Sequence, residues 1–202
     1  MQKTRITKVK MITVGALCIA LAFLLEQMTL FRMPMGGSVT PGSMLFIVLA
    51  GYWLGPFFGI LAGISAGLLD MVTGFYSVHP IQVVMDYLLA FGMLGISGFF
   101  RKMKFGLQIG YVAGVFGRFV MVFLSGIIFF TNFAETGLLP GIWFSVAYNL
   151  TYIAPEMLVT LVIISLPVMK NAIDVVTKSV VSSADYAEIY AKNNPSQKNL
   201  KL

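Results

Sequence analysis

The chain has 202 residues, of which 58% are hydrophobic and only 11% charged, and its mean hydropathy is +0.87. Because so few polar residues cannot cover the surface of a water-soluble globule, the composition predicts an all-α integral membrane protein. The net charge of +6 does not indicate nucleic-acid binding, since the basic residues are dispersed at the ends of apolar runs and form no patch.

Apolar runs that could span a membrane recur along the chain, since about 20 helical residues cross the hydrocarbon core. They lie at residues 11–30, 44–71, 81–100, 107–130 and in a run that starts near Gly141 or Thr151 and ends near Met169. We expect the 44–71 run to form two short helices that break near Gly55-Pro56, because proline removes a backbone donor and crowds the preceding turn. The prediction is therefore six transmembrane helices.

Basic residues gather before the first predicted helix, between the fourth and fifth, and after the last. They are Lys3, Arg5, Lys8 and Lys10, then Arg101, Lys102 and Lys104, then Lys170 and Lys178. By the positive-inside rule all three groups lie in the cytoplasm, and an even helix count agrees with cytoplasmic N and C termini. We expect one domain, residues 1–170, of a multi-pass plasma membrane protein, followed by a polar cytoplasmic tail, residues 171–202, that is partly disordered.

Two serine motifs match enzyme signatures only by chance. Gly63-Ile-Ser-Ala-Gly67 fits the nucleophile elbow, which needs a strand, a turn and a helix, but it lies in an apolar helical run. Ser97 would need a nearby histidine, and the only one, His79, lies roughly 27 Å away along the same predicted helix. The sequence also has no Cys/His cluster and no phosphate-binding loop, so we expect no enzyme, no metal and no cofactor.

Small residues repeat every four positions in two of the predicted helices, at Gly59, Gly63 and Gly67 and at Gly106, Gly110 and Gly114. Such stripes let helix backbones approach closely in lipid, and we expect packing within the chain rather than oligomerisation. In the first helix Gly15, Ala16 and Ala20 form a shorter patch. It could pack against a neighbouring helix or dock another membrane protein.

Asp86 is the most informative residue, because it lies inside an apolar run. A charge toward the bilayer interior costs about 3 kcal/mol or more, so such residues usually face a partner, a cavity or a ligand. Tyr87 follows Asp86, while Tyr76 and Gln82 precede it. A carboxylate among aromatic and amide groups is typical of a site for a cationic, aromatic solute.

Other polar and aromatic residues are expected on the same outer side. Tyr148 and Asn149 lie together there and are both predicted to contact the ligand, and the Asn149 amide offers a donor and an acceptor suited to an aminopyrimidine edge. Gly126 would let a flat ring approach the backbone. For Arg118 and Glu156 we expect a structural ion pair between helices, because an unpaired buried charge is strongly destabilising.

Four segments of the chain carry a family resemblance when taken in order. They are MPMGGSVTPGSM at 33–44, VHPIQVVMDYLLAFG at 78–92, Arg118-Phe119 followed by SGIIFF at 125–130, and SVAYNLTYIAPE at 145–156. Together they resemble the thiamine-specific substrate-binding (S) components of energy-coupling factor (ECF) transporters, over most of residues 10–170. That family has six helices and cytoplasmic termini.

The resemblance implies a receptor that captures thiamine outside the cell and delivers it through a transmembrane coupling subunit and two cytoplasmic ATPase subunits. Ala16 and Ala20 match the family's docking pattern on the first helix. The family's ligand contacts map to Asp86, Tyr87, Tyr76, Gly126, Phe130 and Asn149. The loop at residues 31–43 could act as a lid.

Departures from the family pattern leave the solute open. The chain has Val122 where members have a histidine, Phe144 where they have a tyrosine, and Phe130 where they often have a tryptophan. The solute could therefore be a thiamine precursor or analogue. An alternative is an ion-coupled secondary carrier for a small cationic solute, in which Asp86, Glu156 and Arg118 relay protons, although no inverted repeat is visible. A second is an assembly protein without a solute.

Overall fold

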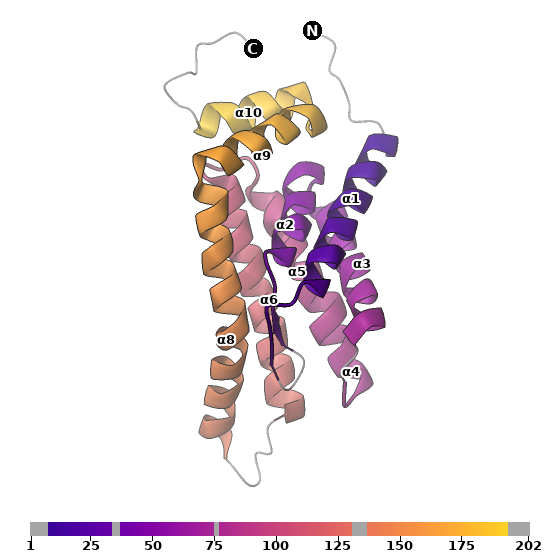
Figure 1. Cartoon of the computed structure of the whole chain (residues 1–202), viewed down its shortest axis with the longest axis vertical. Helices are drawn as coiled ribbons and strands as arrows, with labels where there is room; N and C mark the ends of the chain where they lie inside the picture. The colour runs from indigo at the N-terminus through magenta and orange to yellow at the C-terminus, as the bar shows by residue number, and fades with distance from the viewer. Residues whose placement is uncertain (1–7, 34–36, 75–76, 131–136, 194–202) are drawn as a thin grey trace.

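The computed structural model describes residues 8–33, 37–74, 77–130 and 137–193. In chain order its elements are α1 (Lys8–Gln27), β1 (Phe31–Arg32), β2 (Ser38–Val39), α2 (Ser43–Leu54), α3 (Pro56–Gly74), α4 (Pro80–Val83), η1 (Val84–Leu89), α5 (Ala90–Leu94), η2 (Gly95–Phe100), α6 (Gly106–Phe130), α8 (Leu138–Ser165), α9 (Pro167–Val180) and α10 (Ser183–Asn193). The long helices run roughly along one axis, and α9 and α10 lie across one end of the bundle, near the start of α1 (Figure 1).

Five helices of the described chain are long and apolar enough to cross a membrane. They are Lys8–Gln27, Pro56–Thr73, Pro80–Phe100, Gly106–Phe130 and Leu138–Ser165. The sixth expected span corresponds to α2, which is apolar but only 12 residues long. Every residue of α2 except Phe46 is buried, as expected of a helix that is hydrophobic on all sides.

The predicted break between α2 and α3 is confirmed. Gly55 ends α2 with a φ of 94°, a left-handed conformation that glycine adopts without steric cost. Pro56 then begins α3, where its missing N–H has no partner to lose. The last long helix, α8, begins at Leu138, before either of the two expected starts, and continues through Pro155.

The helix at 80–100 changes its winding along its length. The His79 ring nitrogen Nδ1 accepts a hydrogen bond of 3.1 Å from the Ile81 amide at the helix start. A π-helical turn, η1, follows and contains Asp86 and Tyr87, and the helix ends as the 3-10 helix η2. Single π-turns inside α-helices are frequent at functional sites, so the π-turn that contains Asp86 agrees with the prediction that this residue belongs to a binding site.

The glycine stripes pack helices of the same chain together, as predicted. A Cβ at Gly63 or Gly67 of α3 would collide with the backbone carbonyls of Phe91 and Tyr87. In α6, a Cβ at Gly110 would lie 2.9 Å from the Ser97 carbonyl oxygen. The side chain of Ser97 is itself structural, because its hydroxyl donates a hydrogen bond of 2.7 Å to the Val48 carbonyl.

Much of the segment expected to be a polar, partly disordered tail from residue 171 is helical. Residues up to Asn193 form α9 and α10, which pack on the bundle because Ile173, Thr177 and Val180 recur on one face of α9. The Thr177 hydroxyl accepts a hydrogen bond of 3.0 Å from Trp53 Nε1 of α2. Residues 194–202, where disorder is expected, lie outside the described residues.

Candidate functional site

A cavity of about 150 Å³ lies between the end of α1, the β1–β2 hairpin and helices α3, η1, α6 and α8. The lining includes six of the seven predicted ligand residues, namely Asp86, Tyr87, Gly126, Phe130, Tyr148 and Asn149. The seventh, Tyr76, lies outside the described residues. Elements far apart in sequence therefore bring most of the predicted residues to one cavity.

The two carboxylate oxygens of Asp86 differ in their hydrogen bonds. Its Oδ2 accepts a hydrogen bond of 3.1 Å from Gln82 Nε2, one turn earlier in the same helix. Gln82 is oriented for this role, because its Oε1 accepts a hydrogen bond of 2.8 Å from the Val78 amide. The other oxygen, Asp86 Oδ1, is buried and has no hydrogen bond of normal geometry, although the Ser125 hydroxyl of α6 lies close to the carboxylate. A partly buried carboxylate with one oxygen shielded from water can receive a cation or a donor from a solute.

Asn149 is buried, and its amide is partly engaged within α8. Its Nδ2 donates a hydrogen bond of 2.9 Å to the Ser145 carbonyl, and its Oδ1 accepts one of 2.7 Å from the Tyr152 hydroxyl. These bonds define which side of the amide presents oxygen. Because a carbonyl oxygen has two lone pairs, Asn149 Oδ1 can still accept from a solute. Sequence reasoning did not select Ser145 or Tyr152, although both line the cavity.

Helix packing also requires glycine at position 126, in addition to its place in the cavity lining. A Cβ at this position would collide with the Ser145 hydroxyl of α8. The glycine therefore allows α6 and α8 to approach closely, whereas the sequence predicted an approach by a ligand ring. One turn on, Phe130 lines the cavity at the end of α6, and Val122 lies one turn earlier with 9% of its surface exposed.

The ion pair expected between Arg118 and Glu156 does not form, and both residues are described. Arg118 lies with its guanidinium carbon 4.2 Å from the centroid of the Phe91 ring, and its Nε has no hydrogen-bond partner. An aromatic face attracts a guanidinium electrostatically, which replaces part of the stabilisation expected from a carboxylate. Arg118 lines the cavity.

Glu156 instead binds the backbone that leads into α2. One of its oxygens, Oε2, accepts hydrogen bonds from the Thr40 amide at 3.0 Å and from the Thr40 hydroxyl at 2.8 Å. The other, Oε1, lies 3.4 Å from both the Ser43 hydroxyl and the Met44 amide. Donors at a helix N-terminus favour an anion, so this carboxylate is satisfied without arginine.

The β1–β2 hairpin, which belongs to the loop predicted as a lid, covers part of the cavity. Met33, Gly37 and Ser38 are among the lining residues. The Tyr148 hydroxyl accepts a hydrogen bond of 3.3 Å from the Gly37 amide, which connects the hairpin to α8. The site thus has a short segment over it that is held by side-chain contacts.

Two further carboxylates in the cavity had no ligand role assigned from the sequence. Glu26, at the end of α1, is buried, and Asp70, on α3, is partly buried. The available signal was their position as ionisable residues within apolar runs. Within the described ranges, no group of three or more His, Cys, Asp or Glu residues could hold a metal ion.

The outer face of α1 carries the predicted docking residues. Ala16 and Ala20 are both exposed, and so are the neighbouring apolar side chains of Ile12, Leu17 and Leu24. Gly15 lies on another face, since a Cβ there would touch Leu54 of α2 at 3.5 Å. The small-residue patch is therefore divided between contact with α2 and an open apolar face.

Comparison with known proteins places the chain among transporters. A family described as thiamine transporter protein (Thia_YuaJ) matches residues 12–175. The thiamine transporter ThiT of Bacillus subtilis is 33% identical over 149 residues, which cover 66% of this chain and 76% of that protein. A solved structure of ThiT from Listeria monocytogenes has a TM-score of 0.61 at 20% identity and covers 85% of this chain and 95% of that one, a likeness in fold alone.

Proposed function

The chain belongs to the thiamine transporter protein family, and from this we propose that it is the membrane subunit that captures thiamine for an ECF-type uptake transporter. Membership of this family agrees with a multi-pass cell-membrane protein that is not an enzyme. The observation that supports solute binding best is the buried Oδ1 of Asp86, which has no hydrogen bond of normal geometry, in a cavity with aromatic walls.

In the proposed binding mode, Asp86 is the main polar contact for thiamine. Its free oxygen neutralises the thiazolium charge or accepts a hydrogen bond from the aminopyrimidine. Phe130 stacks on a ring of the solute, and Asn149 contacts the aminopyrimidine edge. Tyr87, Tyr148 and Gly126 complete the wall. Tyr76 is assigned to the site by the resemblance only.

The departures from the family pattern should lower the affinity for thiamine. Val122 and Phe144 line the cavity without the polar groups that family members have at these positions. A lost ring stack or hydrogen bond weakens binding by about 0.5–1.5 kcal/mol each. A thiamine precursor that keeps the aminopyrimidine is therefore the second solute to test.

The proposed topology has six membrane-crossing segments, with α2 as the short one, and cytoplasmic termini. The basic residues at the starts of α1 and α6 and in α9 support this orientation, because they gather at the end of the bundle where α9 and α10 lie (Figure 1). The open face of α1 around Ala16 and Ala20 docks the coupling subunit, which connects to two ATPase subunits. Small residues at that face allow close helix contact in lipid.

The direct test is a titration of the purified full-length chain with thiamine in lipid nanodiscs, followed by isothermal calorimetry and by tryptophan fluorescence. We expect saturable one-to-one binding, with no dependence on ATP. Proteoliposomes that contain only this chain should show no thiamine uptake when a proton gradient is imposed. Uptake under that gradient would instead support the ion-coupled carrier. Absence of binding by thiamine and by its precursors would contradict the proposed function.

A further inference from the structure

Glu26 is a buried carboxylate in the cavity, and only one of its two oxygens has a hydrogen-bond partner among the described residues. Glu26 lies in the last turn of α1, and 9% of its surface is exposed. Oε1 accepts a hydrogen bond of 3.1 Å from the Ser38 hydroxyl of β2. The second oxygen, Oε2, is buried without a hydrogen-bond partner, and no ion pair among the described residues involves Glu26.

An unpaired carboxylate in this position is costly unless something else completes it. Buried charges normally pair or bind a ligand, since desolvation costs several kcal/mol per ion. The nearby arginines do not meet this need, because Arg118 lies over the Phe91 ring and Arg32 is exposed. Three carboxylates and two arginines line the cavity, an excess of one negative charge. The cavity is therefore suited to a cation.

Glu26 and Asp86 reach the cavity from different helices, and each has one bonded and one free oxygen. Glu26 is fixed by Ser38 of the hairpin, whereas Asp86 is fixed by Gln82 of its own helix. We propose that Glu26 is a second anionic contact for the solute and faces its positively charged part, while Asp86 receives its hydrogen-bond donor, so that the cavity selects a molecule that carries both. This inference rests on the proposed function and adds a specificity-determining residue to it.

The chemistry of thiamine matches this pair of carboxylates. Its thiazolium ring carries a permanent positive charge, and its aminopyrimidine carries an amino donor at the other end of the molecule. With Asp86 and Glu26 each engaged, the two free oxygens would both be satisfied on binding. Because Ser38 of β2 binds the other oxygen of Glu26, the Glu26 side chain would then connect the bound solute to the hairpin.

The test compares thiamine with a neutral analogue in which a thiophene ring replaces the thiazolium. Wild-type chain, Glu26→Gln and Ser38→Ala are titrated with both molecules by calorimetry in nanodiscs. We expect Glu26→Gln to weaken thiamine binding by about tenfold or more and to change binding of the neutral analogue by less than about threefold. Ser38→Ala removes no charge, so it should change both affinities in the same proportion. Thermal unfolding of each variant checks the fold.

The outcomes separate this inference from the proposed function. If wild-type chain binds thiamine and Glu26→Gln leaves its affinity unchanged, or weakens both molecules equally, the inference is overturned and the proposed function stands. If the wild type binds neither molecule, both are overturned. Should Glu26→Gln not fold, Glu26→Asp decides: it keeps the charge but withdraws it by one methylene, so thiamine should lose about threefold or more in affinity and the neutral analogue should not.

Discussion

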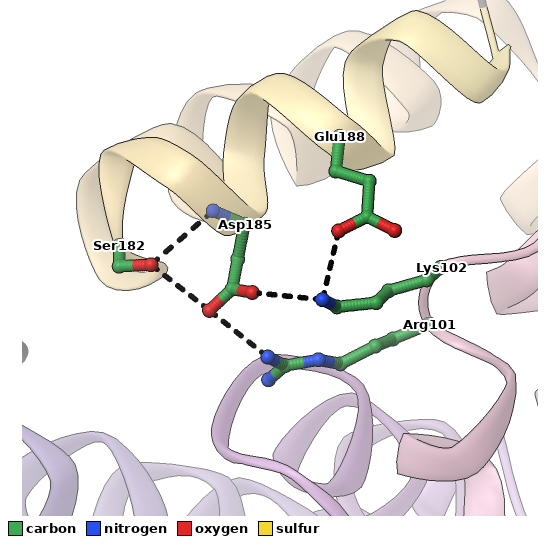
Figure 2. Close-up of polar contacts among 5 residues, drawn as sticks. All are labelled: Arg101, Lys102, Ser182, Asp185 and Glu188. Atoms are coloured by element: carbon green, nitrogen blue, oxygen red, sulfur yellow. Dashed lines mark hydrogen bonds and ion pairs between the residues drawn. The ribbon is translucent and has the colours of Figure 1, made fainter.

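Asp185 receives the Arg101 guanidinium at 3.0 Å, which joins the end of η2 to the first turn of α10 (Figure 2). Lys102 adds a second contact of 3.3 Å to Asp185 and one of 2.7 Å to Glu188. The hydroxyl of Ser182, the residue before α10, accepts from the Asp185 amide at 3.2 Å and donates to its carboxylate at 2.9 Å. Ser182 therefore caps α10, and the Asp185 carboxylate that it binds attaches the helix to the bundle.

Replacing this carboxylate should loosen α10. We expect Asp185→Asn to lower the stability of the attached helix by about 1 kcal/mol, because partly exposed ion pairs and caps each contribute no more than that. In limited proteolysis, Asp185→Asn should be cleaved faster than the wild type between α9 and α10. The difference should be largest at low ionic strength, where salt screens the wild-type ion pairs least. Glu188→Gln is the matched control, since among the described residues Glu188 forms an ion pair with Lys102 alone and should have a smaller effect. Equal cleavage rates for all three chains would contradict this role of Asp185.

The same contacts predict a dependence on acid pH. Burial raises the pKa of the Asp185 carboxyl, but the Ser182 hydroxyl, Arg101 and Lys102 together lower it by more, so it lies below the usual 3.8. A carboxyl with a lowered folded pKa stabilises the fold above its unfolded pKa, and this contribution is lost as the pH falls through the folded value. Below about pH 4, cleavage of the wild type should therefore approach that of Asp185→Asn. A difference that persists at pH 2 would contradict the assignment.

Asp86 and Glu156 should respond differently to neutralisation. We expect Asp86→Asn to weaken thiamine binding by about tenfold or more and to leave the melting temperature nearly unchanged, because in the proposed binding mode its second oxygen contacts the solute. Glu156→Gln should cost about 1–3 kcal/mol of stability, because Thr40 and the start of α2 lose a charged acceptor. Calorimetric binding and thermal unfolding of both variants give the comparison. Equal losses of affinity in both variants would mean that Asp86 is structural.

Gly67 tests the close packing of α3 against η1. In Gly67→Ala the new methyl group would collide with the Tyr87 carbonyl, so we expect a loss of about 1–3 kcal/mol in stability and weaker thiamine binding, since Tyr87 lines the cavity. Gly15→Ala is the control, because its methyl group would meet Leu54 at an ordinary 3.5 Å. Thermal unfolding in detergent measures both. Similar melting temperatures for the two variants would contradict the packing role.

The proposed docking role of the open face of α1 can be tested with a candidate coupling subunit. We expect Ala16→Leu and Ala20→Leu to reduce copurification of a tagged coupling subunit, because larger side chains hold the helices apart. Val162→Leu is the control, since it enlarges a side chain that is 64% exposed on another helix, α8. Unchanged copurification with both leucine variants would place the docking surface elsewhere on the molecule.

Sequence rules of short range determined much of this protein. Apolar run lengths predicted the long helices, and Gly55-Pro56 predicted the break between α2 and α3, because these depend on residues that are neighbours in the chain. The four-residue spacing of glycines predicted close helix packing. The sequence alone made Asp86 a candidate site residue, because a charge within an apolar run is costly wherever it lies.

Only the tertiary structure decided which partner each polar group takes. Glu156 could pair with Arg118 by sequence, but the fold brings it to Thr40, 116 residues away, and sets Arg118 over Phe91. Glu26 lines the cavity because the end of α1 packs against the β1–β2 hairpin, which the sequence does not show. The segment after residue 170 has a polar composition, yet it folds because one face of α9 meets Trp53 and the bundle end. Each outcome depends on distances between segments remote in sequence, which no local pattern encodes.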